Sequence, residues 1–143
     1  MRISRQIVDE VIRLSADINA LNTHLNQKYR GKNPVFDLSD VGKYDSTPEG
    51  ISLKQAKIAR SRYMLSLPYE TIMGLVALMY IGRGDGIAEG ATDLYVELDE
   101  CVDYAKSHFP DDELSVATKY LEEKYPLPEY LSKAKSLVPN ALV

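Results

Sequence analysis

The sequence predicts an all-α fold, a single-domain helical bundle of about five to six helices with a long irregular connection after the first helix. Three observations predict it. Apolar residues recur at helical spacing in several segments, no segment alternates as a half-buried strand does, and glycine and proline gather between the helical segments. Because 143 residues suit one core of ordinary size, we expect a single helical domain over residues 1–143.

The N-terminal segment, residues 4–29, has the most regular pattern. Its apolar positions follow alternating spacings of four and three: Ile7, Val11, Leu14, Ile18, Leu21 and Leu25. Val8 and Ile12 widen this stripe, which favours a helix in a bundle over an isolated two-stranded coil. The periodicity leaves open whether the helix pairs within the chain or across a dimer axis.

Residues 30–50 form the predicted irregular connection, rich in glycine, proline and aspartate, which favour turns. A connection of this length is expected to be functional or mobile. The helical core is predicted to span about 52–137, and its first helix to begin at Ser52, which forms a capping box with Gln55. The polar face of that helix is expected to carry the basic residues Lys54, Lys57 and Arg60.

The most apolar helix is predicted from Pro68 to Ile81. It is apolar nearly all round, so other helices should surround it. It leads into the glycine-rich turn Gly82-Arg83-Gly84-Asp85-Gly86, in which Gly82 or Gly84 is expected to supply the left-handed C-cap. Three further helices are predicted at about Thr92 to His108, Asp112 to Lys124 and Glu129 to Leu137.

The turn offers one candidate binding site. It has neither the spacing of a dinucleotide-binding loop nor the Lys-Ser/Thr of a P-loop. Arg83 is the residue in the turn whose side chain is not explained by ending a helix. Two interpretations stay open: a structural turn in which Arg83 pairs with a carboxylate, or a site for a small anionic ligand or nucleotide. In the second interpretation the ligand would be bound by Arg83, Asp85, Lys54, Lys57 and Arg60.

Catalytic and metal-binding signatures are weak. Acidic residues at helical spacing, namely Asp93, Glu97, Glu100 and Asp103, suggest a metal-dependent hydrolase as a further alternative. However, His24 and His108 are isolated, and the lone Cys101 lies on an apolar stripe, where a free thiol usually behaves as a buried hydrophobe. We therefore expect a solvated acidic face, no catalytic residue, no metal and no cofactor.

Charge and hydropathy limit the partners. Residues 1–62 carry a net charge of about +4 and residues 63–143 about −8. The acidic total argues against general nucleic-acid binding. The longest apolar run is well short of the roughly 20 residues of a membrane span. With no secretory signal at the N-terminus, we expect a cytoplasmic protein without membrane contact.

Part of the chain resembles a bacterial family of unknown function. The resemblance is carried by Leu75-Val76-Ala77-Leu78-Met79-Tyr80-Ile81-Gly82-Arg83-Gly84-Asp85, by Tyr120-Leu121 and by residues 126–131, and it covers roughly residues 66–137, about half the chain. Tyr80 stands where the family more often has tryptophan. The resemblance implies a bacterial or bacteriophage origin and a family core at the helix-to-glycine turn, but no reaction.

The hypothesis that these observations favour is a non-enzymatic helical interaction or regulatory module. The stripe on the first helix, the ten tyrosines and the lack of a catalytic constellation support it. A protein partner or a homo-oligomer formed through the first helix is the expected assembly. The anionic-ligand site and the hydrolase are its alternatives.

Overall fold

The computed structural model describes residues 2–29, 43–85 and 93–143. These residues form six α-helices and two short 3-10 segments, which confirms the predicted all-α fold. The α-helices are α1 (Arg5–Tyr29), α2 (Pro48–Leu65), α3 (Tyr69–Arg83), α4 (Leu94–His108), α5 (Leu114–Glu122) and α6 (Leu127–Leu137). The 3-10 segments are η2 (Asp111–Glu113) and η3 (Pro139–Ala141).

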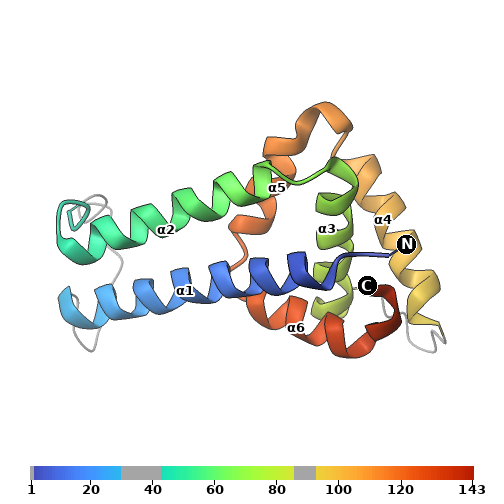
Figure 1. Cartoon of the computed structure of the whole chain (residues 1–143), viewed down its shortest axis with the longest axis horizontal. Coiled ribbons are helices and arrows are strands. Elements are labelled where there is room, and N and C mark those ends of the chain that lie inside the picture. The colour runs from blue at the N-terminus through green and yellow to red at the C-terminus, as the bar shows by residue number, and fades with distance from the viewer. Residues whose placement is uncertain (1, 30–42, 86–92) are drawn as a thin grey trace.

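Helices α1 and α2 lie side by side and extend as a two-helix arm beyond the remaining helices (Figure 1). At the far end of the arm, Glu49 at the start of α2 pairs with Lys28 and accepts a hydrogen bond of 2.8 Å from the Tyr29 hydroxyl. At its other end α1 also packs on α6. The apolar stripe of α1 therefore makes contacts within the chain, with Val8, Val11 and Leu25 buried.

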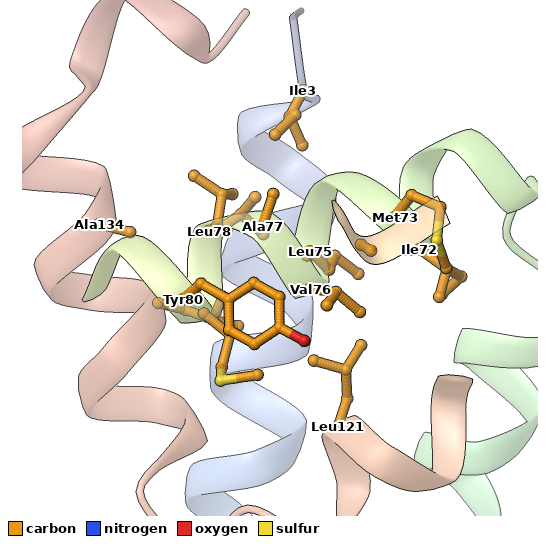
Figure 2. Close-up of a cluster of buried hydrophobic side chains, with 14 of the residues drawn as sticks. Ile3, Ile72, Met73, Leu75, Val76, Ala77, Leu78, Tyr80, Leu121 and Ala134 are labelled. Atoms are coloured by element: carbon orange, nitrogen blue, oxygen red, sulfur yellow. The ribbon is translucent and has the colours of Figure 1, made fainter. Parts of the chain in front are cut away.

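Helix α3 is the centre of the core, as its composition predicts. Every residue from Ile72 to Gly82 is buried, and α4, α5 and α6 all contact the helix. Figure 2 shows side chains of α3 in one apolar cluster with Leu121 of α5 and Ala134 of α6. Ile3 joins the same cluster from the N-terminal segment.

The two glycines at the end of α3 have different functions in the fold. Gly84 is the C-cap, with a left-handed φ of +88° that favours glycine. Gly82 lies inside the helix, where a Cβ atom would stand only 1.7 Å from the backbone oxygen of Tyr130 in α6. Gly82 thus permits close contact between α3 and α6, and Gly84 ends the helix.

Four predicted helix starts differ from the structure by two to four residues, and one of them is that of α5, which begins at Leu114 instead of about Asp112. Helix α2 begins at Pro48 instead of Ser52, because the Thr47 hydroxyl accepts a hydrogen bond of 3.1 Å from the amide of Gly50. The irregular connection therefore ends before residue 50. Helix α4 is capped by Asp93, whose carboxylate accepts from two amides of the first turn, and Thr92, the predicted start, lies outside the described residues. Helix α6 begins at Leu127, two residues before the predicted start, because proline is tolerated in a first helical turn.

The two ends of the described chain are joined by backbone hydrogen bonds. The Ile3 amide donates to the Ala141 carbonyl at 2.8 Å, and the Val143 amide donates to the Ile3 carbonyl at 3.0 Å. They form an isolated parallel bridge between Ile3 and Leu142. In the described ranges no single helix has the length and hydropathy to cross a membrane; α2 and α3 reach both only together, and a bend of 116° separates them.

Candidate functional site

A pocket of about 680 Å³ opens beside the C-terminal end of α3. This volume lies within the range of small-molecule sites. Helices α3, α4 and α5 and the segments after α3 and α4 line it. The lining residues are Tyr80, Arg83, Asp85, Glu97, Glu100, Cys101, Tyr104, His108, Phe109 and Tyr120. Five of these ten carry aromatic or imidazole rings, and four carry a formal charge.

Helix α4 supplies one wall of the pocket with a single face. Glu97, Cys101, Tyr104 and His108 follow spacings of four, three and four, so they lie in one row along the helix. The neighbouring face, which includes Leu98, is buried in the core. Because the core fixes the rotation of α4, the pocket-facing row is fixed with it.

The rings in the pocket contact one another in a chain. Tyr80 and Tyr104 meet edge to face at 5.8 Å between centroids, and Tyr104 lies 4.5 Å from the His108 ring. Phe109 lies 5.2 Å from Tyr120. Burial raises the pKa of the Tyr80 hydroxyl, and the neighbouring Tyr120 adds to that effect. The Tyr80 hydroxyl therefore stays protonated at neutral pH and can donate a hydrogen bond to a ligand.

Arg83 and Asp85 form an ion pair at the edge of the pocket. The Arg83 Nε donates to the Asp85 carboxylate at 2.7 Å, and a second guanidinium nitrogen contacts the same oxygen. The guanidinium carbon also lies 5.4 Å from the centroid of the Tyr80 ring. The hydrogen bond to Asp85 raises the pKa of Arg83. The positive charge of Arg83 is thus largely matched inside the turn itself.

The remaining charges in the pocket are negative. Glu97 and Glu100 both line it, and the Oε2 atom of Glu97 is buried without a hydrogen-bond donor among the described residues. Burial raises the pKa of the Cys101 thiol, and the carboxylates of Glu97 and Glu100 raise it further. Cys101 is half-buried, at the margin of the apolar stripe on which the sequence places it.

The structure brings together only part of the predicted anion site. Arg83 and Asp85 lie in the pocket, whereas Lys54 and Lys57 are exposed on α2, which contributes no residue to it. Figure 1 places the first half of α2 toward the far end of the arm, away from the end of α3. Gly86, the last residue of the predicted turn, lies outside the described residues.

The prediction that Arg60 lies on the polar face of α2 is wrong. Its side chain points into the protein, and 6% of the residue's surface is exposed. Its guanidinium donates to the Ser15 hydroxyl of α1 at 3.3 Å and to the Glu122 carbonyl at 3.1 Å. Since Glu122 is the last residue of α5, Arg60 satisfies a carbonyl that the helix leaves free. Arg60 is therefore a structural residue that joins α1, α2 and α5.

The acidic face of α4 does not form a metal centre in the part of the chain that the structure describes. No group of three or more His, Cys, Asp or Glu side chains there is arranged to hold a metal ion. Asp93 is used as the helix cap, and Glu97 and Glu100 face the pocket. The hydrolase alternative thus gains no support from this face.

Sequence reasoning missed the aromatic residues of the pocket, above all Tyr80, Tyr104 and Tyr120. Two signals were available. Tyr80 is the one aromatic residue in the apolar run from Ile72 to Ile81, and Tyr104 shares a helical row with Glu97, Cys101 and His108. No signal of this kind pointed to Tyr120, which enters the pocket only through the packing of α5 on α3.

The chain was compared with protein-family models, curated protein sequences and solved structures, and nothing matched in any of the three. The resemblance to the bacterial family stays a prediction, and the function is argued from the site alone.

Proposed function

We propose that this protein is a non-enzymatic binding protein for a small organic molecule, which it holds in the pocket between α3, α4 and α5. The observation that carries the proposal is the pocket itself: about 680 Å³, walled by aromatic rings and carrying a few charged groups. Small-molecule sites are typically concave and mostly apolar, with few polar groups that orient the ligand. This function keeps the regulatory role that the sequence favours and moves its site from α1 to the end of α3.

The way the pocket is built supports ligand binding. Tyr80 projects from the buried helix α3, and Phe109 is buried at the end of α4. The Tyr69 hydroxyl donates a hydrogen bond of 2.5 Å to the Phe109 carbonyl, which holds the end of α4 in place. A site whose walls are fixed by the core loses little conformational entropy when a ligand enters.

A fragment screen by ligand-observed NMR tests this proposal, with two tyrosine variants as a matched pair. Tyr104→Ala removes a ring from the pocket, and Tyr125→Ala removes a ring of similar exposure outside it; these side chains are 53% and 58% exposed. We expect aromatic fragments to bind the wild type and Tyr125→Ala but to lose affinity for Tyr104→Ala. Equal binding to both variants, or no binding fragment at all, would contradict the proposal.

We propose self-association through the two-helix arm as a second function, because of one observation on α2. Ile51, Ile58 and Leu65 are 45%, 42% and 48% exposed and recur every seven residues, so they form an apolar stripe on the outer face. A second copy of α2 presenting the same stripe would cover it. Three half-exposed side chains bury far less area than the roughly 800 Å² per partner of a stable interface, so this dimer would be weak.

Sedimentation velocity across micromolar to millimolar concentrations tests the arm. We expect a concentration-dependent shift toward dimer that Ile58→Glu abolishes, while Val116→Glu, at an exposed position on α5, keeps it. A monomer at every concentration would rule out self-association through the arm without affecting the pocket.

A further inference from the structure

We infer that the ligand of the pocket is an organic cation: a protonated amine attached to an aromatic or apolar body. This inference rests on the proposed small-molecule site and adds the charge and class of its ligand. It opposes the anionic ligand that the arginine in the glycine turn suggests from sequence.

The charge balance of the pocket is the first argument. One arginine faces three carboxylates, Asp85, Glu97 and Glu100. Arg83 forms its ion pair with Asp85, the nearest of the three in sequence. Two carboxylates are left without a matching cation among the pocket residues. A ligand with a positive charge would balance them, whereas an anion would add a third unmatched negative charge.

The hydrogen bonding of Glu97 is the second argument. Its Oε2 atom is buried and accepts no hydrogen bond in the described part of the chain. A buried carboxylate oxygen without a donor is costly, and a charged N–H donor satisfies it best. An ammonium group carries three such donors. The unpaired oxygen of Glu97 therefore indicates where the amine of the ligand would bind.

The aromatic walls are the third argument. The faces of phenol and benzyl rings attract cations, and the attraction grows when the cation is removed from water. Arg83 already uses the Tyr80 ring in this way, with its guanidinium carbon 5.4 Å from the centroid. Tyr104 and Phe109 offer further ring surface for the charged end and for the apolar body, while the Tyr120 ring already has the Lys124 ammonium 4.1 Å from its centroid.

The thiol of Cys101 lies among the same three carboxylates. Burial raises its pKa first, and then Glu97, Glu100 and Asp85 each raise it further. Nearby carboxylates disfavour the negative thiolate, and the same carboxylates attract a positive ammonium group. Because Cys101 is the only cysteine and lines the pocket, it also provides a direct readout of occupancy.

Three probes with one indole ring and different charges test the inference: tryptamine, tryptophol and indole-3-acetate. The measurement is the rate at which iodoacetamide, an uncharged reagent, alkylates Cys101 at increasing probe concentration, followed by mass spectrometry. We expect tryptamine to protect Cys101 at a concentration at least about tenfold lower than either other probe, since a matched buried charge is worth at least this factor.

Glutamine variants locate the charge that selects the amine. Glu97→Gln should cut the preference for tryptamine over tryptophol about tenfold. Glu113→Gln, at an exposed glutamate in η2 outside the pocket, should leave this preference unchanged. Circular dichroism of each variant checks that the fold is intact.

The outcomes separate this inference from the proposed function. If tryptophol or indole-3-acetate protects Cys101 as well as tryptamine, the pocket binds small molecules but the inferred positive charge is wrong. Preference for indole-3-acetate that Arg83→Gln removes would establish the anion site in its place. If no probe protects Cys101 and the fragment screen finds no ligand, the proposed function falls together with the inference.

Discussion

Replacing Gly82 with alanine tests the contact on which both the core and the pocket depend. A Cβ atom at this position would stand 1.7 Å from the Tyr130 oxygen and 2.5 Å from its carbonyl carbon. Both atoms belong to the backbone of α6, so no side-chain rotation relieves the clash. Restoring an ordinary contact of about 3.4 Å requires α3 and α6 to separate by about 1.7 Å, across a densely packed core.

The expected magnitude follows from two opposing effects. Alanine is favoured over glycine inside a helix by about 1 kcal/mol. Overpacking a rigid core costs about 1–3 kcal/mol and more when backbones must move. We therefore expect Gly82→Ala to lower the free energy of unfolding by about 3 kcal/mol. Gly84→Ala is the matched control: nothing lies within 4 Å of its Cβ, so only the φ of +88° opposes it, at about 1–2 kcal/mol.

Urea unfolding followed by circular dichroism at 222 nm measures both variants. The reasoning requires Gly82→Ala to be clearly less stable than Gly84→Ala. If the two variants are equally stable, or if Gly82→Ala gains stability from its helix propensity, then the backbones of α3 and α6 do not approach closely at Gly82.

Three further predictions concern single side chains. Lys28 and Tyr29 lower the pKa of Glu49 to about 2. The ionised Glu49 therefore contributes fully to stability above about pH 4.5, and this contribution is lost as the pH falls toward 2. Urea unfolding should show that the difference in stability between the wild type and Glu49→Gln decreases over that range. The raised pKa of Cys101 predicts iodoacetamide alkylation slower than that of free cysteine at pH 7.5 and still accelerating above pH 9; a plateau near pH 8 would refute it. Arg60→Ala should lower the free energy of unfolding by about 2 kcal/mol because it leaves the last carbonyl of α5 unpaired. Replacement of the exposed Arg62 with alanine should change it by no more than about 0.5 kcal/mol. Equal effects in the same unfolding assay would show that burial of Arg60 does not matter.

The sequence predicted those elements of the fold that depend on local pattern. The buried helix α3 follows from its apolar composition, and α1 from its regular stripe. The start of α2 was missed although Thr47, Pro48 and Glu49 form a recognisable helix beginning, because the capping box at Ser52 competed with it. Both patterns satisfy the amides of a first turn, and only the position of the preceding chain decides between them.

The orientation of α2 could not be predicted in this way. Its outer face carries Ile58, while Arg60 is buried, which is the reverse of ordinary amphipathic patterning. Arg60 is stable inside because Ser15 and the end of α5 supply acceptors there. Those acceptors come from segments 45 and 62 residues away, so no local window contains the reason.

The pocket depended even more on tertiary structure. Arg83 was identified because a turn residue with an unexplained side chain stands out locally. Its neighbour Tyr80 looked like one more core residue, since nothing in the sequence shows that α4 and α5 leave space beside that ring. The interpretation that Arg83 pairs with a carboxylate within a structural turn agrees with its ion pair to Asp85.

The proposed site and the core share one helix, and this has a consequence for how a ligand would bind. Helix α3 is buried along its length by α4, α5 and α6, and only at its end does it present Tyr80 and Arg83 to a cavity. Movement of the pocket floor would therefore disturb the buried helix at the centre of the core, and a close-packed core resists small displacements. We expect a ligand to enter by adjusting exposed rings such as Tyr104 while α3 stays in place. Amide hydrogen exchange along the buried length of α3 should then slow on binding, because a ligand that binds the native state alone stabilises it as a whole.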